Sequence, residues 1–200
     1  MRLLIATTNQ GKIREIRELL AGVAVEISVL ADRPPIETPD EVGRTFEDNA
    51  RAKALYYAAR SGMPTVAEDS GLEIDALDGA PGVESARYGG ANTTYPQKFE
   101  LIYDSLRARG VAGSTARFVC AVALADGAGV RFEARGTIEG KIALEPRGTG
   151  GFGYDPIFFY PPFGCTLAEA GPRKAEVSHR AKAFQVLSRV LAKMPTLMIE

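Results

Sequence analysis

Two long strand-like runs joined by a tight turn constrain the fold of this chain most strongly. Residues Ala116–Ala125 and Val130–Ile142 are separated only by Asp126-Gly127-Ala128-Gly129, which has the composition of a turn. A connection this short joins antiparallel neighbours, because parallel strands need a crossover of a dozen or more residues. The sequence therefore predicts a long antiparallel hairpin.

The first sixty residues instead alternate strands with helices. Leu3–Ala6 and Val25–Leu30 have the length and branching of short strands. Gly11–Leu20 places its apolar side chains on one helical face, and a second helix runs from an N-cap at Thr45 to about Ser61. Later elements are expected at Thr65–Ala67 (strand, running into Glu68-Asp69), Leu72–Leu77 (strand), Pro96–Arg109 (helix), Pro156–Tyr160 (strand) and Val177–Lys193 (helix). We therefore expect an α/β fold with a mixed, partly antiparallel sheet, flanking helices, two lobes and a central cleft.

The bulk composition excludes several classes of protein. Two hundred residues with 46% hydrophobic and 24% charged side chains are typical of one globular domain, spanning residues 1–200. The net charge of −1 provides no field for nucleic acid or an anionic membrane, and no apolar run is long enough for a membrane span or a signal peptide. We therefore expect a cytoplasmic protein. Cys120 and Cys165 are too isolated for a disulfide framework or a zinc site, and Cys120 is expected to be buried.

The polar turn between the first strand and the first helix is a candidate phosphate site. Free N–H groups and the dipole at a helix N-terminus favour an anion, and Lys12 adds a positive charge. The segment is not a Walker A loop, because its first glycine is missing and Ile13 replaces the hydroxyl residue. An ordinary capped turn is the alternative. The candidate phosphate-binding residues are Thr7, Thr8, Asn9, Gln10, Gly11 and Lys12.

Four acidic residues occur as two adjacent pairs. Asp40-Glu41 lies in a proline-rich loop, and Glu68-Asp69 opens an acidic turn, Glu68-Asp69-Ser70-Gly71, at the end of a strand. Magnesium requires one or two carboxylates, together with waters and phosphate oxygens. Acids at a strand end lie at the sheet edge where α/β proteins place their sites. Each pair taken singly also fits a solvated acidic turn.

A glycine-rich segment, Gly148–Asp155, contains the pattern G-x-G-x-x-G. A dinucleotide site is not indicated, because the apolar run Pro156–Tyr160 follows where a helix is needed. Glycines around Phe152 instead indicate a sharply bent backbone or close approach to a ligand. An exposed Phe152 or Tyr154 would stack on a base, and Asp155 would bond its edge. A glycine-rich strand entry with a core phenylalanine is the alternative.

Cations gather where the last helix is expected to begin. Ser178 is the expected N-cap, and Lys174 and Arg180 lie near a helix start, where the dipole disfavours positive charge. A bound anion would resolve this conflict. His179 is the only histidine, and a structural role fits it at least as well as a functional one.

Taken together, the segments closely resemble the inosine/xanthosine triphosphate pyrophosphatase family over nearly the whole chain. The motifs that carry the resemblance are A-T-x-N-x-G-K at the start, G-x-T-F-x-x-N-A-x-x-K-A at Gly43–Ala54, E-D-S-G-L at 68–72, P-G-V-x-S-A-R-Y at Pro81–Tyr88, G-T-G-G-F-G-Y-D-P-I-F at Gly148–Phe158 and S-H-R at Ser178–Arg180. The chain departs from the family pattern at Pro172-Arg173 and Ala175, around Lys174.

The resemblance implies an elongated mixed sheet, a cleft between two lobes, a homodimer, and Mg²⁺-dependent cleavage of ITP, dITP or XTP between the α- and β-phosphates. It implies that Thr7 to Lys12 and Lys53 hold the triphosphate, and that Asp69 is the catalytic acid. The implied metal residues are Asp40, Glu41, Glu68 and Asp69. The implied nucleoside residues are Ser70, Phe152, Gly153, Tyr154, Asp155, Lys174, His179 and Arg180.

Elementary chemistry is compatible with this implication. A triphosphate must be neutralised by cations before a nucleophile approaches, and a carboxylate such as Asp69 can orient or deprotonate an attacking water. No Ser-His-Asp or Cys-His arrangement indicates a covalent intermediate. Two alternatives stay open at this point: a pyrophosphatase for another modified nucleotide, and a nucleotide-binding module without turnover.

Overall fold

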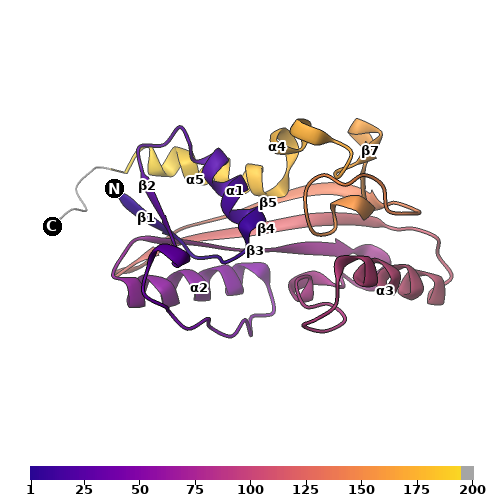
Figure 1. Ribbon diagram of the computed structural model, residues 1–200, viewed down its shortest axis with the longest axis horizontal. Coiled ribbons are helices and arrows are strands. Elements are labelled where there is room, and N and C mark those ends of the chain that lie inside the picture. Colours follow the sequence, from indigo (N-terminus) through magenta and orange to yellow (C-terminus); the bar gives the residue numbers. More distant parts are fainter. Residues whose placement is uncertain (195–200) are drawn as a thin grey trace. The chain divides into compact units, whose positions relative to one another are not determined.

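The computed structural model describes residues 1–194, which form a mixed α/β fold (Figure 1). Within these residues one sheet contains seven strands in the order β2-β1-β3-β4-β5-β6-β7. The strands are β1 (Arg2–Ile5), β2 (Glu26–Val29), β3 (Thr65–Ile74), β4 (Thr115–Asp126), β5 (Gly129–Ile142), β6 (Phe158–Tyr160) and β7 (Cys165–Thr166). The α-helices are α1 (Gln10–Leu19), α2 (Phe46–Ser61), α3 (Tyr95–Ala108), α4 (Lys174–Val177) and α5 (His179–Leu191).

The sheet is mixed, as the sequence predicts. Strand β1 pairs in parallel with β2, where Leu3 faces Ile27, and in parallel with β3, where Leu4 faces Thr65. Strand β6 pairs antiparallel with both β5 and β7. The neighbours β4 and β5 are joined by two residues, and Asp126 Oδ1 accepts a hydrogen bond from the Ala128 N–H at 2.9 Å. The predicted long hairpin is therefore confirmed.

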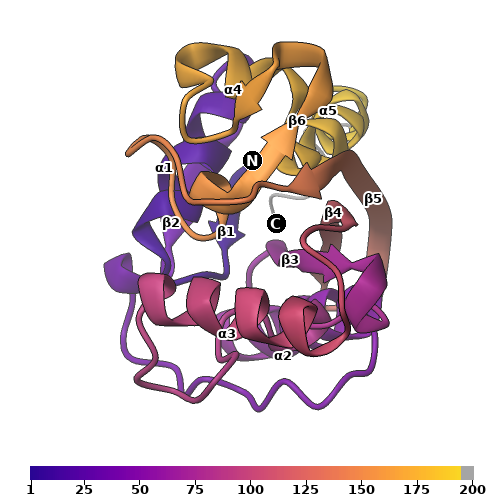
Figure 2. The same cartoon turned by 90° about the vertical axis from the view of Figure 1, so that its right-hand side faces the viewer.

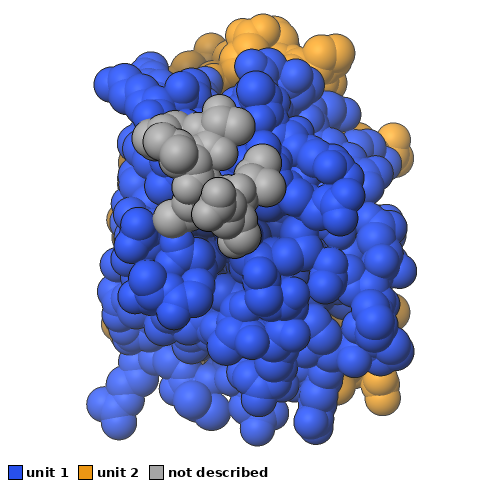
Figure 3. All heavy atoms as spheres, turned by 90° about the vertical axis from the view of Figure 1, so that its left-hand side faces the viewer, with its two compact units in different colours: residues 1–69, 120–136, 179–200 blue, residues 70–119, 137–178 orange. Residues whose placement is uncertain are grey.

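The chain divides into two compact units, coloured separately in Figure 3. Unit 1 comprises Met1–Asp69, Cys120–Gly136 and the chain from His179 onward, and unit 2 comprises Ser70–Val119 and Thr137–Ser178. Each unit has a buried apolar cluster of its own.

In unit 1, helices cover both faces of the strands. Helices α1 and α5 lie on one face and α2 lies on the other (Figure 1). Leu3 and Ile5 of β1 join Phe184 of α5 in the buried apolar cluster, because alternate strand residues point to the same face. Helix α2 begins where the sequence predicts, since the Thr45 hydroxyl accepts the Asp48 N–H at 3.1 Å.

A glycine sets the approach of α5 to the sheet. A Cβ atom built on Gly136 of β5 lies 2.1 Å from the His179 backbone oxygen and 2.7 Å from the Ala183 backbone nitrogen. A side chain at residue 136 would therefore push away the first turn of α5, which carries His179 and Arg180.

In unit 2, the apolar cluster unites α3 with the long strands. In both views α3 lies on one side of β3 and β4, and α4 lies on the other (Figures 1 and 2). Phe99 and Ile102 of α3 pack in one cluster with Leu72 of β3. The rings of Phe118 and Phe158 stack at a centroid distance of 4.5 Å. None of the helices among residues 1–194 combines the length and the apolar character that a membrane span requires.

Three expectations about local structure are wrong. Glu68-Asp69-Ser70-Gly71 is not a turn at a strand end but the middle of β3, which runs extended from Thr65 to Ile74. The expected strand at Pro156–Tyr160 begins only at Phe158, because Asp155–Ile157 forms a 3₁₀ turn. The strand expected at Leu72–Leu77 ends at Ile74, because Asp75–Leu77 forms a 3₁₀ turn. Ser178, in contrast, directly precedes the last helix as expected: its backbone is extended (φ −60°, ψ 150°), and α5 begins at His179.

Candidate active site

The residues predicted to bind ligand fall into both units. Unit 1 contains Thr7, Thr8, Asn9, Gln10, Gly11, Lys12, Asp40, Glu41, Lys53, Glu68, Asp69, His179 and Arg180. Unit 2 contains Ser70, Phe152, Gly153, Tyr154, Asp155 and Lys174. His179 and Arg180 thus belong to the same unit as the acidic residues.

The turn before α1 has the geometry of a capped helix N-terminus. Asn9 is the N-cap: its Oδ1 accepts the Lys12 N–H at 3.1 Å, and its own N–H donates to Thr7 Oγ1 at 3.3 Å. Thr8, Asn9 and Gln10 are exposed. The N–H groups that no capping bond satisfies remain suited to an anion.

Glu68 lies at the centre of a buried ionic network. Its carboxylate accepts hydrogen bonds from Arg180, with Nε 3.2 Å from both oxygens, and lies 3.2 Å from Lys12 Nζ. The Cys120 thiol donates to Oε2 at 2.9 Å. Burial alone would raise the pKa of Glu68, but Arg180, Lys12 and the thiol outweigh it and hold this pKa well below its usual value. Glu68 is therefore the counter-charge of two cations.

Arg180 is almost completely buried, with a relative exposure of 1%. Besides Glu68 it contacts Glu15 of α1, whose Oε2 lies 2.5 Å from Arg180 Nη1. Sequence reasoning missed Glu15, although its spacing of three residues from Lys12 places both on one face of α1. The guanidinium thus ties α5 to α1 and β3.

Asp69 is held by α2. Its Oδ2 accepts a hydrogen bond from Asn49 Nδ2 at 2.9 Å, and its Oδ1 lies 3.5 Å from Lys53 Nζ. Burial raises the pKa of Asp69, Lys53 and Asn49 oppose this rise, and the Glu41 carboxylate adds to it. A carboxylate with a raised pKa is a better proton acceptor than an exposed aspartate.

Lys53 stands between two of the predicted metal carboxylates. Its ammonium lies 2.5 Å from Glu41 Oε1 and is also close to Asp69. These two acids share one cation in the structure, which is the charge pattern that a divalent ion would also satisfy. Asp40 is exposed on the preceding loop.

Glu41 and Asp69 are the two carboxylates best placed to hold a magnesium ion together with waters and phosphate oxygens. Among the described residues, no group of three or more His, Cys, Asp or Glu side chains converges as a metal site. Magnesium does not require such a group, since it is commonly bound by one or two carboxylates plus waters and phosphate oxygens. The oxygens of Glu68, in contrast, already contact Lys12, Arg180 and Cys120.

In unit 2, Asp155 organises the glycine-rich segment. Its Oδ2 accepts the Phe152 N–H at 2.8 Å and a charge-assisted bond from Lys174 Nζ at 2.7 Å. A Cβ atom at Gly151, where φ is +70°, would lie 2.0 Å from the same oxygen. Only glycine therefore allows this carboxylate to reach its partners.

Lys174 and Phe152 form the part of unit 2 that is best suited to an aromatic ligand. The Lys174 ammonium lies 4.8 Å from the centroid of the half-buried Phe152 ring. Lys174 itself is buried, so its charge is held in place by Asp155 and by the ring. A stacking surface and a cationic donor thus occur together.

Of the two aromatic side chains that the sequence offers for stacking, Tyr154 is excluded by its burial. Tyr154 is buried, its hydroxyl donates to the Ser85 backbone oxygen at 2.8 Å, and its ring meets Tyr95 edge-on at 5.3 Å. Burial raises the pKa of Tyr154. The Tyr154 side chain therefore anchors the glycine-rich segment in the interior of unit 2. Phe152, in contrast, is only half-buried.

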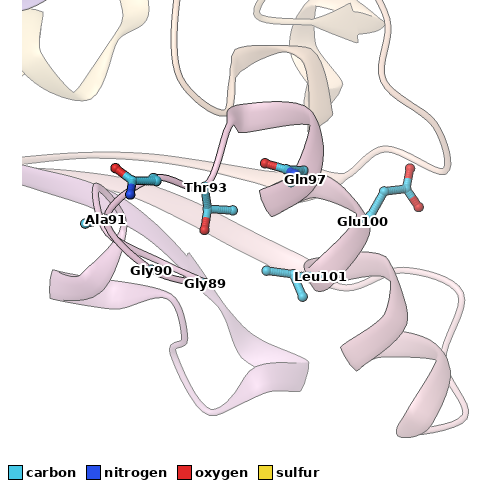
Figure 4. A pocket seen from close by; sticks show the side chains of 8 residues that line it. Gly89, Gly90, Ala91, Thr93, Gln97, Glu100 and Leu101 are labelled. Atoms are coloured by element: carbon cyan, nitrogen blue, oxygen red, sulfur yellow. The ribbon is translucent and has the colours of Figure 1, made fainter.

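A hollow of about 670 Å³ in unit 2 contains none of the predicted residues (Figure 4). It lies between the Gly89–Thr93 loop and the first turns of α3, and Gln97, Glu100 and Leu101 face it. No cation lines it in the described part of the chain, so it does not suit a phosphate group.

The fold and these groups define a class of α/β protein that pairs buried acids and lysines with a helix N-terminus suited to anions. The model of the Ham1 family matches residues 3–190, so the chain belongs to the Ham1 family.

Curated relatives and solved structures agree with this assignment. A dITP/XTP pyrophosphatase from an Exiguobacterium species is 46% identical over 188 residues, which is 94% of this chain and 95% of the relative. A protein of the same name from Geobacter sulfurreducens is 44% identical, over 93% of this chain and 94% of its own. The structure of a HAM1 protein from Coxiella burnetii superposes with a TM-score of 0.86 at 39% identity, covering 97% of this chain and all of that one.

Proposed function

We propose that this chain is a Mg²⁺-dependent pyrophosphatase that hydrolyses ITP, dITP and XTP to the monophosphate and pyrophosphate. The observation that carries the proposal is the buried Asp69 carboxylate, oriented by Asn49 and Lys53, with a capped helix N-terminus and Lys12 in the same unit. The dITP/XTP pyrophosphatases that the chain resembles at up to 46% identity support the substrate class.

The triphosphate is assigned to unit 1. The exposed N-terminal turn of α1 supplies N–H donors, while Lys12 and Lys53 supply positive charge. Magnesium, when bound at Glu41 and Asp69, would supply further neutralisation of the phosphate oxygens. Positioning and electrostatics of this kind account for most of the catalysis of phosphoryl transfer.

Asp69 is assigned to the attacking water. Its raised pKa favours proton acceptance, and its two oxygens are held by different partners, which fixes the direction of the remaining lone pairs. The water oxygen forms a bond to the α-phosphorus as the bond to the bridging oxygen breaks. The water proton passes to Asp69, and pyrophosphate leaves.

The base is assigned to unit 2, with Phe152 as the stacking surface. Hypoxanthine and xanthine present a 6-oxo acceptor, whereas adenine presents an amino donor. Lys174, held by Asp155, is a fixed donor that a 6-oxo group would accept and that the amino group of adenine would not, and mismatches of this kind discriminate by about 10⁴-fold or more. Guanine shares the 6-oxo group, so its rejection requires a contact at the 2-position.

A panel of nucleoside triphosphates tests this function. Pyrophosphate release is measured with ITP, dITP, XTP, GTP, ATP and a methylated or pyrimidine triphosphate, each with Mg²⁺ and with EDTA. We expect turnover of the first three with Mg²⁺ and none with EDTA. Preference for a different nucleotide would assign the chain to another modified substrate. Tight nucleotide binding without pyrophosphate release would make it a binding module.

We further propose a homodimer, as the family resemblance implies, and a cytoplasmic location, as the composition suggests. Light scattering coupled to gel filtration measures the mass directly. A mass near 21.4 kDa, that of one chain, would contradict the dimer.

A further inference from the structure

The Asn49 side chain bridges two parts of unit 1 that carry functional acids. It is almost fully buried, with a relative exposure of 1%, and lies in the first turn of α2. Its Nδ2 donates to Asp69 Oδ2 at 2.9 Å, and its Oδ1 accepts the Gly43 N–H at 2.8 Å. A carboxylate only accepts and a backbone N–H only donates, so the orientation of the amide is unambiguous.

Only an amide fills this position. A hydroxyl is too short to reach in both directions, and an apolar side chain would remove one hydrogen bond from the Gly43 N–H and one from the buried Asp69 carboxylate. Residue 43 must be glycine for this contact, because a Cβ atom there would lie 2.5 Å from Asn49 Oδ1 and 2.9 Å from the Asp48 Cβ. The loop is thereby held directly against α2.

The bridge acts on both acids at once. Gly43 follows Glu41 by two residues, so the Asn49–Gly43 bond fixes the loop that carries the Glu41 carboxylate. Lys53 lies one helical turn after Asn49 on α2 and contacts both Glu41 and Asp69. One face of α2 therefore holds each oxygen of Asp69 with a different residue.

We propose that Asn49 is a positioning residue for the hydrolytic reaction, which sets the orientation of the Asp69 carboxylate and the place of Glu41. This inference rests on the proposed function. The terminal torsion of an aspartate is broad, so without Asn49 the carboxylate turns toward Lys53 and loses its direction toward the water. Mutation of a residue that orients a metal-binding carboxylate through a hydrogen bond typically lowers activity about 10–100-fold.

The test compares three variants with the wild-type enzyme. Asn49→Ser and Asn49→Leu remove the bridge, and Thr65→Val is the matched control. Thr65 is also buried and lies on β3 four residues before Asp69, but its hydroxyl donates only to the Met63 backbone oxygen at 2.9 Å. The readouts are kcat per folded enzyme, the thermal midpoint, and calorimetric binding of an ITP analogue with a non-hydrolysable α,β-methylene bond.

The expected result is a separation of turnover from binding and stability. For the Asn49 variants we expect kcat to fall about 10–100-fold, while the Kd of the analogue stays within about threefold, because Lys12 and Lys53 remain in place. Thr65→Val lowers the thermal midpoint and leaves kcat unchanged. Equal kcat in Asn49→Ser and the wild type, or a Kd that weakens in step with kcat, would overturn the positioning role.

A further variant keeps the test decisive if neither Asn49 variant folds. Gly43→Ala retains Asn49 but forces its Oδ1 out of place, so we expect kcat to fall by about tenfold or more. A folded Gly43→Ala enzyme with wild-type turnover would refute the inference. If the wild-type chain hydrolyses no triphosphate in the panel, the proposed function fails and the inference fails with it; an active wild type with unaffected variants removes the inference alone.

Discussion

Removal of the Arg180 guanidinium is the sharpest test of the buried network in unit 1. Arg180→Met keeps much of the side-chain volume but removes the bonds to Glu68 and the contact with Glu15. Breaking one partner of a buried ion pair costs about 3–5 kcal/mol, because the other charge stays buried without compensation. For a chain of this size, each kcal/mol lowers Tm by about 2–4 °C, so we expect a decrease of roughly 6–20 °C.

The effect should depend on pH in a defined direction. The folded-state pKa of Glu68 lies below its unfolded value, so the stability it contributes is present above the unfolded pKa and is lost as the pH falls toward the folded pKa. Without Arg180, burial raises the pKa of Glu68 and the folded variant accepts a proton in mild acid. The difference in stability between the two proteins should therefore be largest near pH 7 and smaller near about pH 4.

Unfolding by guanidinium chloride, followed by circular dichroism at both pH values, measures this difference in stability. Arg117→Met is the matched control, since Arg117 contacts Asp75 and Glu139 on the surface of unit 2, where an ion pair contributes about 0–1 kcal/mol. The double variant Arg180→Met/Glu68→Gln should regain part of the loss, because the uncompensated charge is gone. If Arg180→Met costs no more than Arg117→Met, the reasoning about the buried network is wrong.

Three further outcomes follow from single contacts. Asp69→Asn should fold normally yet lose about 10²–10⁴-fold in kcat, and steady-state kinetics with near wild-type turnover would exclude Asp69 as the base. Iodoacetamide should label Cys165 in the native protein but Cys120 only after unfolding, because burial and the Glu68 carboxylate raise the pKa of the Cys120 thiol; mass spectrometry of the labelled peptides decides. Gly136→Ala should cost about 1–3 kcal/mol in chemical denaturation, since its Cβ meets the His179 carbonyl at 2.1 Å, whereas Gly127→Ala, with open space around it, should cost little; equal stabilities would contradict the close approach of α5.

Local signals in the sequence predicted most of the elements. The N-cap at Thr45, the apolar face of α1 and the turn between β4 and β5 all depend on residues a few positions apart, and the structure confirms each. The prediction for the acidic segment is wrong because it, too, depends only on neighbouring residues. Glu68-Asp69-Ser70-Gly71 has the composition of a turn, but β3 continues through it because partners from other elements satisfy both carboxylates in the interior.

The sequence names candidate site residues one by one, but it does not show which of them contact each other. Glu15 and Arg180 are 165 positions apart and Cys120 lies 52 positions from Glu68, so no local pattern reveals that they touch. The glycine-rich segment leaves open whether Phe152 or Tyr154 is exposed, and only the packed chain shows that the Tyr154 hydroxyl donates to the Ser85 backbone oxygen in the interior. Which polar groups are satisfied inside the protein is a property of the packed chain.

Glu68 and Asp69 are consecutive residues of an extended strand, and consecutive side chains of a strand leave it in opposite directions. The contacts follow this alternation: Glu68 meets α1 and α5, and Asp69 meets α2. The two carboxylates therefore lie on opposite faces of β3, and each face has different charged and polar neighbours. Exchanging the two letters would preserve composition and net charge but would put each carboxylate among the other's neighbours. A shift of one residue in the pairing of β3 would do the same, so the register of β1 against β3 decides which neighbours each carboxylate meets.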